Sequence, residues 1–428
     1  MDGLIIGYDL CNDYGQISCY VPGEASQQPE GLNLGDGAFP ELMPVAVCKK
    51  RGEDTWLIGE EAFRTALMSN GIMVDKLMKQ VCRRGMATIE GKKYSAQDLL
   101  FIFLEETIKV VLEKKNAEKV GSIVFTIQTL DPVIMDTLIF CTDKLGLSRD
   151  QVFIISHTES FLYYAISQTK ELWVNQVALF DLSDEGLYYY ELDMKRGVSP
   201  KVVVVENAKL EEGFSLDILD TPAGERMADS ILASCAKRLL VARKKVFSSV
   251  YLSGKGFDRC QEWAGDFLKV ILDNKRRVFA TESIFAKGAV YAGIDYTRAT
   301  TLYPYTFICE GRLTASVYMN VLYNGTKHKL VLGAAGDNWY ETRSTIELIP
   351  DDTDQLEFTV KYVEGVGKGE NKIFVPLEGI PNRPNKTTRL LVTTAFTSEN
   401  TMLLRVEDRG FGDLFASNGW VFKEEVTL

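Results

Sequence analysis

The chain has 428 residues, of which 46% are hydrophobic and 25% are charged, with a formal net charge of −11 at pH 7. This length and composition predict more than one hydrophobic core, divided among two or three domains. The acidic balance and the scattered basic residues argue against nucleic acid or an anionic membrane surface as the main partner, and no apolar run is long enough to span a bilayer.

The few cysteines and histidines also restrict the chemistry. Eight cysteines occur singly, without a Cys-x-x-Cys pair, which favours reduced thiols over a disulfide framework. The opening residues lack the pattern of a secretory leader, so we expect a cytoplasmic protein. Only two histidines, His157 and His328, are present, which leaves little material for a histidine-rich metal site or a Ser/His/Asp relay.

Residues 4–20 and 177–192 have nearly the same pattern of apolar and polar residues. The two stretches lie about one domain length apart in the sequence. In each, an apolar run ends at an Asp-Leu pair, crosses a polar turn and resumes, which predicts a β-hairpin. The carboxylates of Asp9 and Asp181 then stand beside exposed backbone N–H groups, an arrangement suited to a metal and a phosphate. One such hairpin can arise by chance because Asp is a common turn residue. Two copies, each followed by similar elements, indicate an internal duplication.

Strands and helices alternate after the first hairpin, as in a layered α/β domain. Ser95 followed by Asp98 is a capping box that predicts the start of a helix. The predicted elements are a polar loop at 24–38, strands at 43–48 and 55–58, a helix from residue 59, a helix after residue 95, a strand at 120–127, a helix at 131–145, a strand at 152–156 and a helix at 159–168.

The same alternation follows the second hairpin. The strand predicted at 201–206 lies at a sheet edge that either pairs with another chain or is covered internally. A helix at 224–243 has Met227, Ile231, Leu232, Leu239 and Leu240 as its apolar positions.

A strand at 249–253 ends in Gly254-Lys255-Gly256 and feeds a helix that reaches about Leu272. Anions bind where a strand end meets a helix N-terminus, although the Walker A pattern is absent. The next helix, 282–293, is rich in small residues. It either packs closely against another helix or frays, with Gly293 as its C-cap.

Short strands and turns without a long helix follow Tyr296, which predicts an all-β sandwich. We predict three domains in all: residues 1–168, residues 169–298 and residues 304–428.

The order of motifs resembles the seventy-kilodalton heat-shock protein family along essentially the whole chain. Residues 9–20 and 180–191 resemble the two phosphate loops of that family, and residues 250–256 resemble its adenosine loop. Residues 154–166 and 283–293 resemble the two connecting helices that cross at its hinge. Further similarity lies in residues 56–62, after the first phosphate loop, and in residues 376–384, 390–396 and 403–410, which resemble the peptide-holding β-sandwich of the family.

The resemblance implies a duplicated ribonuclease-H-like fold of the actin and hexokinase type, with two lobes, followed by an all-β sandwich. It also implies ATP or ADP with Mg²⁺ as cofactors and a peptide or protein partner on the β domain. In this scheme Asp9 and Asp181 hold the metal, Lys76 lies near the γ-phosphate, His157 or Glu159 places the attacking water, and Gly288 belongs to the hinge. The implied nucleotide-binding positions are Asp9, Cys11, Asn12, Asp13, Asp181, Ser183, Asp184, Glu185, Gly186, Gly254, Lys255 and Gly256.

This sequence departs from the family pattern at the positions that bind phosphate in the family. Cys11, Asn12 and Asp13 stand where the family has Gly and two hydroxyl residues, and residues 183–186 replace a run of glycines. Side chains there block the approach of phosphate to the backbone. A carboxylate about 5 Å from a phosphate costs roughly 3 kcal/mol at an effective dielectric near 20.

Three further positions differ. Asp75 stands at the position of the catalytic lysine, beside Lys76, and His157 stands at that of an acidic residue. The chain between the second hairpin and Ser249 is also too short for the subdomain that clamps adenine in the family.

Three interpretations follow. The leading one is a chaperone-like protein whose nucleotide site is degenerate and binds or hydrolyses ATP weakly or not at all, so that it is not an enzyme or retains only residual ATPase activity. The second is an active Mg-ATP-dependent chaperone ATPase. The third is an actin-like cytoskeletal or scaffold protein.

Overall fold

A computed structural model describes residues 3–23, 28–35, 37, 39–195, 197–199, 201–243, 245–367 and 369–428. Within the predicted loop at 24–38, residues 24–27, 36 and 38 lie outside this described part. The chain forms two compact units: Met1–Met194 with Val205–Tyr303, and Lys195–Val204 with Pro304–Leu428. The first unit is mixed α/β with mixed sheets, and the second is antiparallel all-β from about residue 315.

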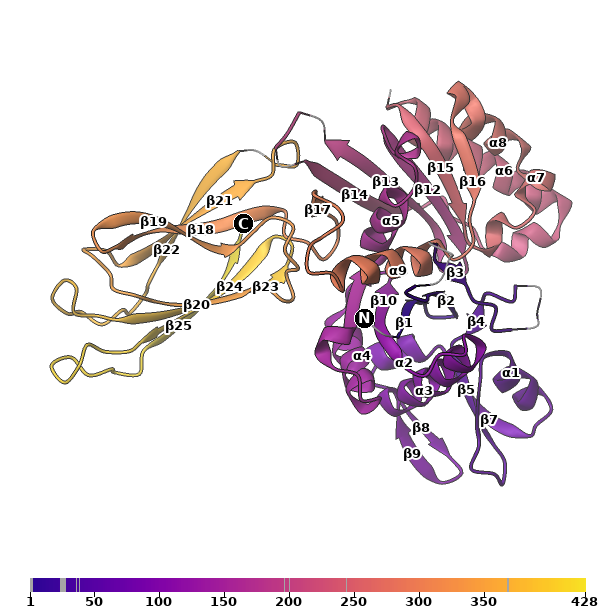
Figure 1. Ribbon diagram of the computed structural model, residues 1–428, viewed down its shortest axis with the longest axis horizontal. Coiled ribbons are helices and arrows are strands. Elements are labelled where there is room, and N and C mark those ends of the chain that lie inside the picture. Colours follow the sequence, from indigo (N-terminus) through magenta and orange to yellow (C-terminus); the bar gives the residue numbers. More distant parts are fainter. Residues whose placement is uncertain are drawn as a thin grey trace. The chain divides into compact units, whose positions relative to one another are not determined.

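The first sheet has the strand order β11-β10-β1-β2-β3, with β4 also pairing with β2. Figure 1 labels β10, β1, β2, β3 and β4 of this sheet. β1 and β2 form the predicted hairpin, while β1, β10 and β11 run parallel. The strands are β1 (Leu4–Leu10), β2 (Tyr14–Tyr20), β3 (Glu30–Gly31), β4 (Met43–Pro44), β10 (Val120–Ile127) and β11 (Val152–Ser156). Smaller sheets contain β5 (Ala46–Lys50), β6 (Trp56–Ile58) and β7 (Gly71–Asp75), and β8 (Met86–Ile89) with β9 (Lys92–Ser95).

Three of the helices around the first sheet begin at a side chain that caps their N-terminus. The Ser95 side chain accepts a hydrogen bond from the Asp98 N–H in the predicted capping box, and Asp131 caps the next helix. The helix predicted from residue 159 begins at His157, because the Ser156 hydroxyl accepts from the Glu159 N–H. The helices are α1 (Gly59–Leu67), α2 (Leu77–Cys82), α3 (Ala96–Lys114), α4 (Pro132–Lys144) and α5 (His157–Ile166).

The second sheet has the order β16-β15-β12-β13-β14-β17, and its first five strands repeat the arrangement of the first sheet. β12 and β13 form the second predicted hairpin, and β12, β15 and β16 run parallel. The hairpin therefore occupies the same place in both sheets. The strands are β12 (Gln176–Ser183), β13 (Gly186–Lys195), β14 (Val202–Lys209), β15 (Phe247–Ser253), β16 (Arg277–Ala280) and β17 (Thr306–Ile308).

The helices of this half differ from the prediction in two respects. Met227 is 60% exposed because the buried stripe of α6 runs through Ala228, Leu232 and Cys235 instead. The single helix predicted after residue 256 starts only at Cys260, because Arg259 adopts a left-handed conformation, and it is broken at Ala264, whose backbone is not helical (φ −97°, ψ 47°). The helices are α6 (Pro222–Ala236), which continues as a π-helical turn (Lys237–Val241), α7 (Cys260–Trp263), α8 (Gly265–Leu272) and α9 (Ile284–Tyr296).

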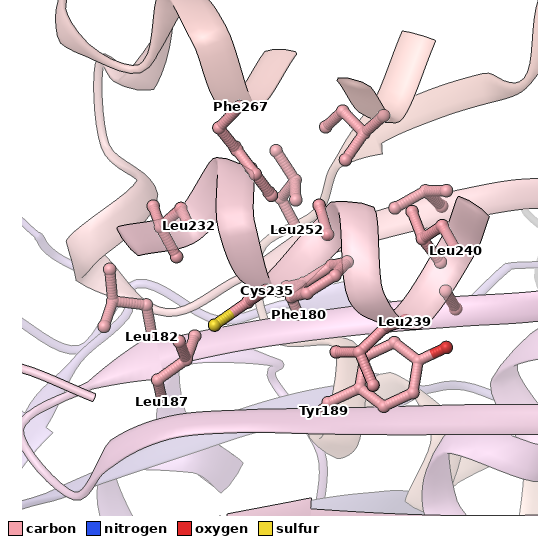
Figure 2. Close-up of a cluster of buried hydrophobic side chains, with 14 of the residues drawn as sticks. Phe180, Leu182, Leu187, Tyr189, Leu232, Cys235, Leu239, Leu240, Leu252 and Phe267 are labelled. Atoms are coloured by element: carbon pink, nitrogen blue, oxygen red, sulfur yellow. The ribbon is translucent and has the colours of Figure 1, made fainter. Parts of the chain in front are cut away.

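A cluster of buried apolar side chains holds the second hairpin against α6 and α8 (Figure 2). Phe180 and Leu182 of β12 reach into this cluster together with Leu187 of β13, and Cys235 and Leu239 meet them from the helix above. Because side chains alternate along a strand, Asp181 projects from the opposite face of β12.

The small residues of α9 pack closely against α5, as one of the two alternatives predicted. A Cβ atom at Gly288 would lie 2.0 Å from the backbone oxygen of Ser160. The Ser160 hydroxyl donates to the Phe285 carbonyl across the same contact. The other alternative, a helix that ends at Gly293, is wrong: α9 continues to Tyr296, and Gly293 is buried.

Internal pairing covers part of the strand predicted to lie at an edge. Val202–Val204 run parallel to β17 (Thr306–Ile308), so at these residues the edge is not open to another chain. Both segments belong to the second unit.

The rest of the second unit consists of two antiparallel sheets, β19-β18-β21-β22 and β20-β23-β24-β25. One hydrophobic cluster draws buried residues from both, among them Val317, Phe358, Val392 and Leu404. The strands are β18 (Ala315–Tyr323), β19 (Thr326–Gly333), β20 (Arg343–Leu348), β21 (Gln355–Tyr362), β22 (Glu370–Pro376), β23 (Leu390–Ser398), β24 (Thr401–Asp408) and β25 (Val421–Thr427). Among all the described residues, no helix is long and apolar enough to cross a membrane.

Candidate functional site

The tips of the two hairpins carry the carboxylates singled out in the sequence. Asp9 sits near the end of β1 and Asp181 near the end of β12, and both are more than nine-tenths buried. Buried neighbours on either side, such as Tyr8 and Leu10, fix which face each strand turns to the core. Both carboxylates line the same cavity.

That cavity is small and acidic. Its volume of ≈ 70 Å³ has room for about five water molecules at roughly 10–15 Å³ each. Five carboxylates line it, but only one lysine does. Its lining residues are Asp9, Cys11, Asp13, Tyr14, Gln16, Leu42, His157, Asp181, Ser183, Asp184, Glu185, Ser253, Gly254, Lys255 and Phe285.

A buried imidazole contacts the first carboxylate. His157, the first residue of α5, places Nε2 2.8 Å from Asp9 Oδ1 and donates to it. Its Nδ1 lies 3.5 Å from the Tyr190 hydroxyl, and its ring stacks on Phe285 with the ring centroids 3.9 Å apart. The orientation of His157 is therefore fixed on both ring nitrogens and on one ring face.

The tips of the two hairpins are hydrogen-bonded to each other. The backbone N–H of Asn12 donates to Glu185 Oε1 at 3.1 Å, and the Asn12 side-chain amide donates to both carboxylate oxygens at 2.9 and 3.2 Å. An exposed backbone N–H at a hairpin tip is a natural donor to an anion. Here the anion is a carboxylate of the protein itself.

The lysines near the site are paired with acids of the two hairpins. Lys255 Nζ lies 2.6 Å from Asp184 Oδ2 and 4.9 Å from the centre of the Tyr14 ring. Lys76 Nζ lies 3.3 Å from Asp13 Oδ1, and this contact raises the pKa of Lys76. Lys76 thus contacts Asp13, which lines the cavity, but Lys76 itself is not among the lining residues.

Burial and like charge shift the ionisation of groups in the cavity. Burial raises the pKa of Asp181 to about 6, with further increases from Asp9 and Glu185 and opposing effects from His157 and a hydrogen bond with Ser253. Burial and the same carboxylates raise the pKa of the Cys11 thiol well above its usual value. The thiol donates to Asp9 Oδ1 at 3.5 Å.

Several predicted residues do not line the cavity. Glu159 is fully buried in α5 and accepts a hydrogen bond from Tyr296. Gly256 packs under Leu182, and Gly186 faces Lys209. Gly288 lies in the α5–α9 contact described above. Among the candidates to place a water molecule, only His157 therefore lines the cavity.

The structure also adds residues that the sequence did not single out. Tyr190 and Phe285 orient His157, and Ser253 hydrogen-bonds with Asp181. Ser253 is the last residue of β15 and lies directly opposite Asp181 of β12, to which β15 runs parallel. The strand predicted at 249–253 ends at this residue, so pairing that strand with the second hairpin could have identified it. The contacts of Tyr190 and Phe285 with His157 depend on how α5 and α9 cross. No local pattern in the sequence predicts that crossing.

Fold and site together define a class: a mixed α/β protein with an acidic cavity between two equivalent hairpins, continued by an all-β unit. A family model described as "Family of unknown function (DUF5716) C-terminal" matches residues 28–310, and the chain therefore belongs to the DUF5716 family. Residues 312–428 match a second model, described as "Domain of unknown function (DUF8552)". The comparison with curated proteins found no match.

Proposed function

We propose that this protein is a chaperone-like binding protein with a duplicated ribonuclease-H-like fold of the actin and hexokinase type, in which the nucleotide site no longer supports ATP hydrolysis. The matching order of five strands in each sheet, the two equivalent hairpins and the close crossing of α5 with α9 support this fold. The residues in the cavity support the loss of activity.

The contact between Asn12 and Glu185 is the observation on which the proposal mainly rests. Three hydrogen bonds join the two tips, and they use the donors to which a phosphate would bind. A nucleotide must therefore break these bonds and approach Asp184 and Glu185, which repel it. Because Lys255 and Lys76 are already paired with Asp184 and Asp13, little positive charge is available to offset that repulsion.

The all-β unit then has the binding role. Its two sheets over a common core are consistent with a β-sandwich, and we propose a peptide or protein as its partner. Without a working ATPase, such binding is constitutive or is controlled by another protein.

Thermal unfolding of the purified protein with millimolar Mg-ATP or Mg-ADP tests the proposal. A ligand at 100 times its dissociation constant adds about 2.7 kcal/mol to the stability of the folded state. We expect no rise in the melting temperature of the wild type. A rise that disappears in Asp9→Asn and Asp181→Asn would contradict the degenerate-site proposal and favour the active Mg-ATPase, which hydrolysis assays would then examine.

The Glu185→Ala variant tests whether the protein's own carboxylate blocks the anion position. Removing it frees the Asn12 N–H and takes one negative charge away. We therefore expect Mg-ADP or pyrophosphate to raise the melting temperature of this variant more than that of the wild type. Glu118→Ala, at an exposed position away from the cavity, is the matched control. An identical response of all three proteins would show that Glu185 is not the obstacle.

A further inference from the structure

Three different metal-binding side chains converge on the cavity: the carboxylate of Asp9, the thiol of Cys11 and the imidazole of His157. One potential ligand atom from each lies within 4.8 Å of the other two. His157 Nε2 lies 2.8 Å from Asp9 Oδ1, and Cys11 Sγ lies 3.5 Å from the same oxygen. Ligand atoms of a tetrahedral zinc ion, with bonds of about 2.0–2.3 Å, lie about 3–4 Å apart.

The surrounding structure holds the three groups in place. Asp9 lies within β1, while Cys11 follows it in a turn closed by the hydrogen bond from the Cys11 N–H to the Tyr14 carbonyl at 3.1 Å. His157 is fixed by Phe285 and Tyr190. A partner on the second nitrogen is typical of a metal-binding histidine, because it orients the ring and selects the tautomer.

The charge around the cavity favours a cation. Besides Asp9, the carboxylates of Asp13, Asp181, Asp184 and Glu185 line it, with Lys255 as the one lysine among the described lining residues. A divalent ion would offset the mutual repulsion of these carboxylates. The neighbouring carboxylates would in turn strengthen its binding.

We propose that Asp9, Cys11 and His157 bind a divalent transition-metal ion of the Zn²⁺ type, with a fourth coordination position that faces the cavity. Thiolate and imidazole ligands favour Zn²⁺ over the hard ion Mg²⁺, which prefers oxygen ligands. This site differs from the Mg²⁺ site expected at Asp9 and Asp181, and it does not depend on whether nucleotide binds.

Binding requires a defined movement of protons. The Cys11 thiol loses its proton to solvent as the sulfur–metal bond forms, so at least one proton is released per ion. The hydrogen bond between His157 and Asp9 breaks, Nε2 gives up its proton to solvent while Nδ1 takes one up, and the freed Nε2 lone pair binds the metal. The imidazole N–H then lies at Nδ1, beside the Tyr190 oxygen. The metal would tie the tip of the first hairpin to the start of α5.

Titration of the metal-free full-length protein with Co²⁺, followed by competition with Zn²⁺, tests this site. A Co²⁺–thiolate bond gives a charge-transfer absorption in the near ultraviolet. We expect one ion per chain with this absorption in the wild type, and its loss in Cys11→Ser together with a fall in affinity of about 100-fold or more. Zn²⁺ should displace Co²⁺ and raise the melting temperature of the wild type but not that of Cys11→Ser.

Two matched controls use the remaining exposed candidates: Cys82→Ser, which removes an exposed cysteine, and His328→Gln, which removes the only other histidine. Both should bind Co²⁺ as the wild type does. His157→Gln should weaken binding as Cys11→Ser does; if it fails to fold, which circular dichroism would show, the nearly isosteric Cys11→Ser decides alone. The proposal is overturned if the wild type shows no thiolate absorption or if Cys11→Ser keeps it.

Discussion

Asp181 shows how strongly the cavity disfavours negative charge. The carboxylate is 8% exposed, and burial is the main reason why its pKa rises from 3.8 to about 6. A carboxyl group with a raised pKa binds its proton more tightly in the folded state than in the unfolded state. The stability of the protein therefore falls as the pH rises from about 4 to about 6.

This relation predicts that Asp181→Asn is more stable than the wild type at pH 7.5. The rise in pKa from 3.8 to about 6 corresponds to about 3 kcal/mol as an upper value, and most of the difference should be lost near pH 4, where Asp181 is protonated in the folded state and about half protonated in the unfolded state. Urea unfolding of both proteins with a chelator present, at pH 4, 5.5 and 7.5, measures it. Equal stability at pH 7.5 would mean that the cavity does not penalise this carboxylate.

Asn12 and Glu185 show why part of the site lies beyond sequence analysis. Asp9 and Asp181 could be found from the sequence, because both stand where an apolar run meets a polar turn in two nearly repeated stretches. The hydrogen bonds of Asn12 join residues 173 positions apart, and those of His157 and Asp9 join residues 148 positions apart. These pairings depend on how the two sheets and α5 meet, which no local pattern encodes.

A helix or strand could be predicted from the sequence where a capping residue, a turn or an apolar run marks it. The capping box at Ser95 identified the start of α3, and the two hairpins followed from apolar runs on either side of polar turn residues. α2 escaped prediction because it is short and follows Lys76 in a left-handed conformation. The hairpin of β8 and β9 and the four-residue strand β16 are mostly exposed, so neither has a strong apolar pattern.

The crossing of α5 and α9 depends on the missing side chain of Gly288. A methyl group there would meet the Ser160 backbone oxygen at 2.0 Å, and backbone at both sides of the contact leaves little room to adjust. We predict that Gly288→Ala lowers the free energy of unfolding by about 3 kcal/mol, measured by chemical denaturation.

Gly265→Ala is the matched control for Gly288→Ala, because Gly265 also lies in a helix and a Cβ atom there meets nothing within 4 Å. It should be neutral or stabilise the protein by about 0.4–1 kcal/mol. If both variants lose the same stability, the contact between α5 and α9 is not as close as the structure indicates.

At the scale of the whole molecule, the all-β unit has a core of its own. Its hydrophobic cluster lies within residues 313–428. The guanidinium of Arg383 forms a bidentate ion pair with the buried carboxylate of Asp408, with N–O distances of 2.8 and 2.7 Å. We predict that the fragment 312–428 folds alone and unfolds in one cooperative thermal transition, as seen by circular dichroism and calorimetry.

A shorter fragment, residues 312–400, is the control for this prediction. It lacks β24 and β25, and with them Met402, Leu404 and Val406 of the cluster, so it should remain unfolded. The prediction fails if the fragment 312–428 shows no cooperative transition or binds a dye for exposed apolar surface as strongly as the control does.

The path of the chain through the two units has a consequence for how this architecture can arise or be rearranged. Ten residues of the second unit, Lys195–Val204, are inserted within the sequence of the first, and the chain returns to the second unit only at Pro304. Val202–Val204 pair with β17, which lies within the family match that ends at residue 310. A gene fusion or deletion with a single junction at residue 304 would therefore leave β17 without its pairing strand. Recombination can exchange residues 312–428 as a module, whereas β17 has to be inherited together with the α/β sequence that surrounds its partner.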